Sequence, residues 1–255
     1  EPERADLAHV LFFSTLAGLC KWLPVPLLDD VLVPLLRRHM LRAQLSQAGL
    51  RLGAPQARRL AREPGRCLRC ARKLCYYGCL CFVLEWFCHA CCFAWTLKES
   101  VEIASALLHE GWLVAYCLRA GHLCEGTLSK DVDLWRVRQA ILLTCGRVDT
   151  SPITQTLRKV FSGSRDLMRS SAEKLLRALR SQGVGKPGCA GADSVEEALD
   201  VVEEEERAEL EGLEERLAEA LVSQRPYLRR LAALFEEQLE KLRSEDARPA
   251  WWQVL

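Results

Sequence analysis

Apolar residues recur along most of the chain at intervals of three and four, the spacing that gathers them on one face of an α-helix. Residues 6–22 are apolar nearly all round. After Pro24 and Pro26 a second helical pattern begins near Asp29 and Asp30, whose carboxylates suit the positive end of a helix dipole. We therefore expect the first part of the chain to form an apolar helical hairpin.

Further helices are predicted along the rest of the body. Residues 74–97 form a 24-residue apolar run in which Glu85 is the only formal charge, and helical patterns follow at about 98–120 and 131–147. A longer pattern over 151–179 places its apolar residues on one face. No segment shows a convincing strand-like alternation. The sequence therefore predicts an all-α fold, built as a helical bundle.

Composition divides the chain into four regions. Residues 1–180 form an apolar and basic helical body, 181–194 a Gly-rich linker, 195–246 an acidic amphipathic helical pair and 247–255 a tail. Leucines at three- and four-residue spacing run along both helices of the pair, which Pro226 separates. Two arrangements would bury these leucines: docking on the body of the same chain, or pairing with another copy. The heptad pattern is too short to predict a long coiled coil.

The net charge of +1 conceals a strong asymmetry. Residues 37–73 carry eleven Lys/Arg against Glu63 alone, whereas residues 194–246 carry seven Lys/Arg and 17 Asp/Glu. A basic block in front of an apolar run is typical of a segment that contacts anionic lipid on the cytoplasmic side of a membrane. The block lacks interleaved aromatic residues and a recognisable reading motif, so we expect lipid headgroups or the acidic helices as its partner, and no nucleic acid.

The apolar run of 74–97 is long enough to cross about 30 Å of hydrocarbon. Glu85 would then lie near the middle of the bilayer, which costs about 3 kcal/mol. A re-entrant or hairpin mode, with residues 6–36 as a second insert, is therefore favoured over one clean span. The side chains expected to contact the membrane are Arg37, Arg38, Arg58, Arg59, Arg62, Arg66, Arg69, Trp86 and Trp95.

A Cys-rich segment, 67–92, holds eight of the 13 cysteines. Cys67-x2-Cys70, followed after 17 residues by Cys88-x2-Cys91, matches the spacing of a structural zinc site with four thiolate ligands. The residues between are strongly apolar, which also fits buried cysteines that pack as small hydrophobes, or acylated cysteines at a membrane. Disulfides are a further alternative, although nothing in the sequence indicates export. The zinc-bound soluble module is the alternative to membrane association.

Candidate catalytic residues are few. His109, Glu110 and Gly111 lie inside an apolar helical pattern and lack the second His of a zinc-protease motif. We interpret them as a polar patch on a helix face. An enzyme that uses Glu85, His89, His109 or Glu110 is a weaker reading, because no nucleophile–base pair is evident. We therefore expect a non-enzymatic protein with no catalytic residue and, apart from the zinc alternative, no cofactor.

Two segments carry a resemblance to known proteins: WLPVPLLDDVLVPLLRR and LKESVEIASALLHEGWL. They resemble an uncharacterised group of bacterial helical proteins, loosely similar to EcsC-type membrane-associated proteins. The residues that carry the resemblance are Pro24, Pro26, Asp29, Asp30, His109, Glu110 and Gly111. The resemblance implies an all-helical, membrane-associated architecture and no particular activity. The density of cysteines departs from that pattern.

Overall fold

The computed structural model describes residues 2–23, 28–50, 60, 89–181 and 210–244. All the regular structure in these ranges is helical, so the predicted all-α fold is confirmed. The helices are α1 (Pro2–Leu19), η1 (Cys20–Trp22), α2 (Leu28–Gln47), α5 (His89–Arg119), α6 (Glu125–Ser129), α7 (Asp131–Arg147), α8 (Ser151–Gly163), α9 (Arg165–Ser181), an unlabelled helix over 210–222, and α11 (Arg225–Ser244).

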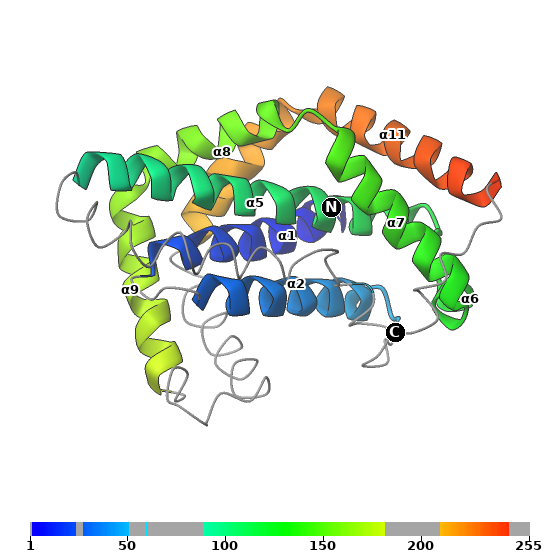
Figure 1. The fold of residues 1–255 in the computed structure, drawn as a ribbon, viewed down its shortest axis with the longest axis horizontal. Coiled ribbons are helices and arrows are strands. Elements are labelled where there is room, and N and C mark those ends of the chain that lie inside the picture. Colours follow the sequence, from blue (N-terminus) through cyan, green and yellow to red (C-terminus); the bar gives the residue numbers. More distant parts are fainter. Residues whose placement is uncertain (1, 24–27, 51–59, 61–88, 182–209, 245–255) are drawn as a thin grey trace, which may run out of the picture.

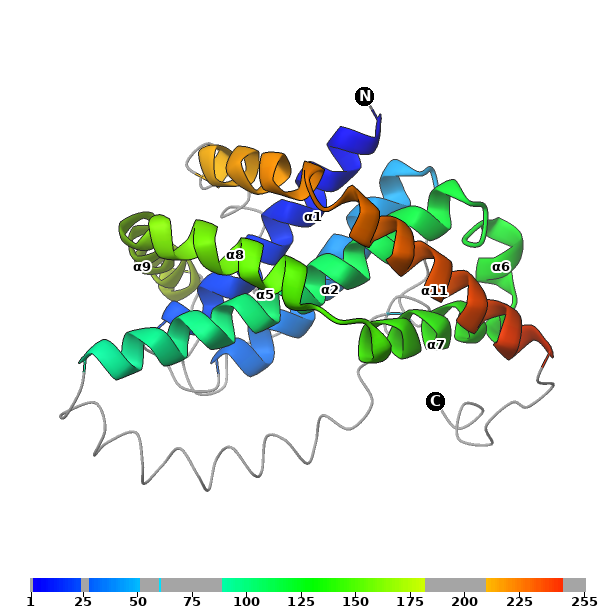
Figure 2. The ribbon, with the colours of Figure 1, turned by 90° about the horizontal axis from the view of Figure 1, so that it is seen from above.

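Helix α5 is the central element of the bundle. Its 31 residues run the length of the molecule, with α1 antiparallel beside it and α2 parallel to it (Figure 1). Helix α8 covers α5 on another side, and α7 and α11 cross near its C-terminal end (Figure 2). The expected hairpin of α1 and α2 is present, and side chains of both helices enter one continuous hydrophobic core.

Two glycines let the helices approach closely. A Cβ atom on Gly111 of α5 would lie 2.8 Å from Val10 Cγ1 of α1 and 3.0 Å from the Met40 sulfur of α2. A Cβ atom on Gly18 of α1 would lie 3.1 Å from the Phe161 ring of α8. The absence of a side chain at Gly111 sets how near α1 and α2 come to α5, and its absence at Gly18 sets how near α8 comes to α1.

The boundaries of two predicted helices differ from the observed ones. The pattern over 151–179 is interrupted at Ser164, whose φ of −118° and ψ of 30° are not helical, and α9 turns away from α8 there (Figure 1). The buried side chains of both halves keep helical spacing, so the pattern alone did not reveal the bend. Conversely, α5 is continuous across 97/98, where two separate elements were expected.

The C-terminal helices dock on the body of the same chain. The leucine stripe of 210–222 is buried, as are Leu231, Phe235 and Leu239 of α11. Of the two arrangements that the sequence left open, intramolecular docking is therefore the one that the structure shows for 210–244. The two helices meet at a turn over 223–224, and Pro226 occupies the first turn of α11, where a missing N–H costs nothing.

In the part of the chain that the structure describes, one helix is long and apolar enough to cross a membrane, Phe93–Arg119. About two thirds of its most apolar stretch (67%) is buried inside the protein, as in the core helix of a helical bundle. The apolar stretch Leu7–Trp22 is shorter and is likewise packed into the core from Val10 onward. These apolar helices therefore cover each other in this arrangement.

Candidate functional site

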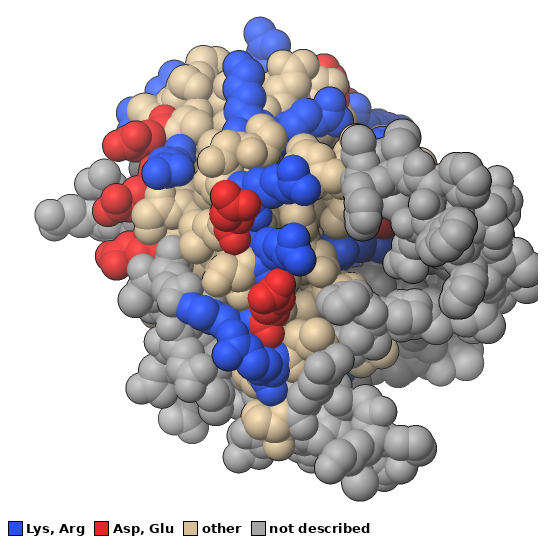
Figure 3. Space-filling model, turned by 90° about the vertical axis from the view of Figure 1, so that its left-hand side faces the viewer, with Lys and Arg blue, Asp and Glu red and all other residues tan. Residues whose placement is uncertain are grey.

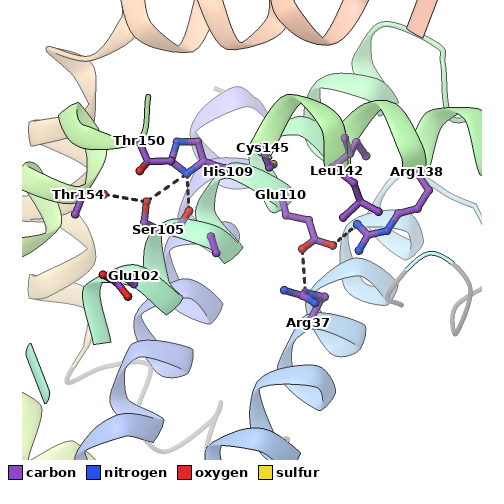
Figure 4. A pocket seen from close by; sticks show the side chains of 12 residues that line it. Arg37, Glu102, Ser105, His109, Glu110, Arg138, Leu142, Cys145, Thr150 and Thr154 are labelled. Carbon is purple, nitrogen blue, oxygen red and sulfur yellow. Dashed lines mark hydrogen bonds and ion pairs between the residues drawn. The ribbon is translucent and has the colours of Figure 1, made fainter. Parts of the chain in front are cut away.

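The most unusual feature of the core is a buried carboxylate between two guanidinium groups. Arg138 Nη1 of α7 donates to Glu110 Oε1 of α5 at 2.5 Å, and Arg37 Nε of α2 lies 2.9 Å from Glu110 Oε2 (Figure 4). All three residues are buried, with exposed fractions of 3% for Arg37, 5% for Glu110 and 3% for Arg138. One carboxylate therefore joins three helices that lie far apart in the sequence.

The positions of these charges follow from the helix patterns. Arg138 lies on the buried side of α7, between Leu134 and Ile141, and Arg37 lies beside Leu36 on the buried side of α2. Burying an ion costs several kcal/mol, and the attraction between well-oriented partners offsets that cost. The cluster therefore favours the observed alignment of α2, α5 and α7, because a shift of any one helix would separate buried charges that are paired here.

His109, the residue before Glu110, connects α5 to α11. Its Nδ1 lies 2.6 Å from the carbonyl oxygen of Ser105, and because a carbonyl can only accept, Nδ1 carries the proton. Its Nε2 then accepts a hydrogen bond from the Tyr227 hydroxyl at 2.5 Å. Burial lowers the pKa of His109, and the bond to the Ser105 carbonyl only partly counters this effect. The imidazole is therefore neutral at neutral pH.

A second polar contact fixes α11 further along. Glu236 Oε1 accepts hydrogen bonds from the Tyr116 hydroxyl at 2.7 Å and from His122 Nε2 at 2.8 Å. Partial burial acts to raise the pKa of Glu236, but these hydrogen bonds outweigh it and the pKa is lowered. The same interaction raises the pKa of Tyr116 to about 12. Phe235 packs edge-on against the Tyr116 ring, so polar and apolar contacts coincide.

A cavity of about 200 Å³ lies beside the charge cluster (Figure 4). Its walls come from α2, α5, α7 and the start of α8, and its lining residues are Arg37, Glu102, Ser105, Ala106, His109, Glu110, Arg138, Ile141, Leu142, Cys145, Thr150 and Thr154. The cavity is thus large enough for solvent or a small molecule.

The groups around the cavity do not form an activated nucleophile. Ser105 Oγ lies 3.4 Å from His109 Nδ1, but that nitrogen is the protonated one and cannot take the hydroxyl proton. Burial raises the pKa of the Cys145 thiol to about 12, with a further contribution from the Glu110 carboxylate, so this thiol stays protonated. Neither side chain is therefore an activated nucleophile in this geometry.

The residues predicted to contact a membrane have different environments. The prediction for Arg37 is wrong, because its side chain is buried and paired with Glu110. Arg38, its neighbour on α2, is half-buried. Trp95 is 53% exposed, as a membrane anchor requires. The others, Arg58, Arg59, Arg62, Arg66, Arg69 and Trp86, lie outside the described residues.

The predicted zinc ligands cannot be placed from the described residues. Cys67, Cys70 and Cys88 lie outside them, and Cys91 is known only as a backbone position in the first turn of α5. Among the His, Cys, Asp and Glu side chains that are described, no group of three or more is arranged to hold a metal ion. The zinc site at 67–91 therefore stays a prediction.

The exposed Trp95 lies at one end of the bundle, near the start of α5. Phe93, in the second turn of α5, packs against Trp22, and the Arg165 guanidinium of α9 lies 4.2 Å from the centroid of the Phe93 ring. Lys98 Nζ lies 5.7 Å from the centroid of the exposed Trp95 ring. Figure 3 shows this end of the molecule with Lys and Arg side chains in a band down its middle, and acidic side chains among them and along one edge.

Sequence reasoning identified Glu110 and His109 but not their partners. Arg138 gave a usable signal, a charge at an apolar position of its helix between Leu134 and Ile141. Tyr227 gave none, because 118 residues separate it from His109 and only tertiary structure joins them. Comparison of the chain with known protein families, with curated proteins and with solved structures found no match.

Proposed function

We propose that this chain is a non-enzymatic, membrane-associated protein that lies on the cytoplasmic face of an anionic membrane. The observation that carries the proposal is the exposure of Trp95, at the end of the apolar run 74–97 and at the start of α5. Large amphipathic aromatic side chains favour the boundary between water and hydrocarbon. Val31, which is 52% exposed, lies in the first turns of α2, at the same end of the bundle (Figure 1).

The packing of α5 supports a peripheral mode. Most of its apolar surface is covered by α1, α2 and α8, so exposing it to lipid would require the bundle to open. In the proposed arrangement the bundle stays folded on the surface of the bilayer. The apolar sequence before α5 supplies the hydrophobic contact, and basic residues supply the headgroup contact.

The acidic helices are then available for a partner. Their leucines are buried against the body, which leaves Glu211, Glu215 and Glu219 exposed at intervals of four residues. Such a stripe faces solvent along one side of the helix. We infer that a protein partner would bind this acidic face, and that the leucines are not its contact.

Fractionation of cells that contain the full chain tests the proposal. We expect the protein in the membrane pellet, with partial release by high salt and full release by detergent. Trp95→Ala should increase the soluble fraction severalfold, whereas Val222→Ala, an equally exposed apolar residue elsewhere, should not. Recovery of the wild-type chain wholly in the supernatant after ultracentrifugation would overturn the proposal.

A further inference from the structure

We propose that the exposed side of α9 binds the headgroups of anionic lipids, through a basic stripe formed by Arg165, Arg169 and Arg177. This inference rests on the proposed function and names the surface that faces the bilayer. The lipid contact that the sequence suggested for Arg37, which is buried, is assigned instead to side chains that are exposed in the folded protein.

The stripe follows from the amphipathic pattern of α9. Met168, Ala172 and Leu175 are buried against the core, whereas Arg165, Arg169 and Arg177 are exposed. The three arginines span about 18 Å along the helix axis and, at about 100° per residue, about 120° around it, on the exposed part of the helix surface. Three guanidinium groups spaced in this way present a row of donors that suits several phosphate-bearing headgroups rather than one bound ion.

The charge of α8 and α9 sets them apart from the rest of the described structure. Together they carry seven Lys/Arg and two Asp/Glu, an excess of five positive charges. No other pair of consecutive described helices has so large an excess. The band of Lys and Arg in Figure 3 shows that basic side chains dominate the middle of this end of the molecule. A surface of this sign attracts anionic lipid at a distance of about one Debye length.

The position of the stripe connects it to the aromatic end of α5. Arg165 packs over the Phe93 ring, so the stripe begins beside the first turns of α5, where Trp95 is exposed. Cationic and aromatic side chains at the same end of a protein form the combination found at membrane interfaces. Contact through this end would leave α11 away from the bilayer (Figure 1).

Two acidic side chains reduce the positive charge of the stripe. Asp166 and Glu173 are exposed on the same helix, and Arg169 Nε lies 3.3 Å from Glu173 Oε1. An exposed pair of this kind contributes little to stability and exchanges readily with solvent. The arginines therefore remain available to headgroups, and binding through them should be moderate and sensitive to salt.

Vesicle co-sedimentation with the full chain tests the stripe. The probes are vesicles of phosphatidylcholine alone and of phosphatidylcholine with phosphatidylserine. The test variant is R165Q/R169Q/R177Q, and the matched control is R225Q/R229Q/R230Q, which removes the same charge from exposed positions of α11. A charge-preserving variant, R165K/R169K/R177K, checks that the effect comes from charge, and circular dichroism checks that each variant is folded.

We expect R165Q/R169Q/R177Q to bind the phosphatidylserine vesicles at least about tenfold more weakly than the wild-type chain does. The α11 control and the lysine variant should bind them about as well as the wild-type chain. If R165Q/R169Q/R177Q and the α11 control lose binding equally, or if R165Q/R169Q/R177Q loses none, the stripe is overturned while the proposed function stands. Failure of the wild-type chain to bind either vesicle overturns the proposed function itself. Binding to RNA with no binding to vesicles would make the stripe a nucleic-acid surface and would also overturn the inference.

Discussion

The Tyr227 hydroxyl donates a hydrogen bond to His109 Nε2 at 2.5 Å, across 118 residues of sequence. His109 is followed by Glu110, which pairs with α2 and α7, and by Gly111, against which α1 and α2 pack. Three consecutive residues of α5 therefore each fix a different set of neighbouring helices. The polar tripeptide that the sequence singled out is a structural junction of the bundle.

Removing the charge of Glu110 is expected to be severe. Glu110→Gln leaves two buried guanidinium groups facing a neutral amide, and breaking a buried pair in this way costs about 3–5 kcal/mol. Glu102→Gln is the matched control on the same helix, because Glu102 is exposed and its change should alter the free energy of unfolding by less than about 0.5 kcal/mol. Urea unfolding of both variants measures the difference. Equal, small effects would show that the charge cluster does not stabilise the bundle.

Loss of the Tyr227 hydroxyl should have a smaller, defined cost. Tyr227→Phe keeps the ring packing but leaves His109 Nε2 buried without its donor, which costs about 1–3 kcal/mol. Because the bond joins α11 to α5, hydrogen exchange should rise first in the N-terminal half of α11. Unchanged stability and unchanged exchange would contradict this hydrogen bond.

The pH dependence of stability is expected to report His109. Its pKa is lowered by burial from an ordinary value of 6.5, so below that pH the unfolded chain takes up a proton that the folded chain does not. Stability from this group is complete above pH 6.5 and is lost as the pH falls toward the lowered pKa, with a slope of at most about 1.4 kcal/mol per pH unit. The lowered pKa of Glu236 also makes stability fall with falling pH, but only below the ordinary glutamate pKa of 4.5.

Denaturant unfolding between pH 7 and pH 5 excludes the titration of Glu236, and comparison of the wild-type chain with His109→Gln separates His109 from the other four histidines. We expect His109→Gln to flatten the slope in the window, whatever its effect on stability at pH 7. An identical slope in the wild-type chain and the variant would show that His109 is not the group that titrates.

The docking of 210–222 can be tested with adjacent residues. Leu221 is buried and Val222 is exposed, so Leu221→Ala should cost about 2–5 kcal/mol and Val222→Ala less than about 0.5 kcal/mol. The stability of the wild-type chain should not depend on protein concentration, because the leucines are buried within one chain. A transition whose midpoint rises with concentration would instead indicate that these helices pair between copies.

Cysteine reactivity offers a further measurement. Cys124 is exposed, and a hydrogen bond with Thr127 lowers its pKa, whereas burial raises the pKa of Cys117 and of Cys145. Since the thiolate is the reactive form, brief alkylation at pH 7.5 should modify Cys124 well before the other two. Peptide mass spectrometry measures the order. Equally fast modification of Cys145 would contradict the burial of its thiol.

The helical pattern was sufficient to predict the fold class, the hairpin of α1 and α2, and the position of α7. It failed at Ser164, because the apolar side chains on both sides of that bend keep one continuous spacing. The basic block suggested that Arg37 faces lipid, yet Arg37 is buried. Charge counted along the sequence does not show which arginine is needed to neutralise a carboxylate from another helix, and only the packing of α2 on α5 reveals that Glu110 takes this one.

The sequence drew attention to His109 and Glu110 of this junction but not to the residues that they contact. A His–Glu pair in an apolar helix is unusual enough to be noticed, but its interpretation as a polar patch on a helix face did not predict that His109 and Glu110 are buried. Tyr227, Arg138 and Arg37 come from three other helices, and no local pattern relates them to α5. Their meeting depends on topology, which helical periodicity does not determine.

Flotation of the full chain with vesicles in a density gradient tests the central claim most directly. We expect the wild-type protein to rise with vesicles that contain phosphatidylserine at low salt, and to rise less at high salt, because basic side chains contact the headgroups. A chain that remains at the bottom of the gradient with every vesicle composition, while folded by circular dichroism, would contradict membrane association.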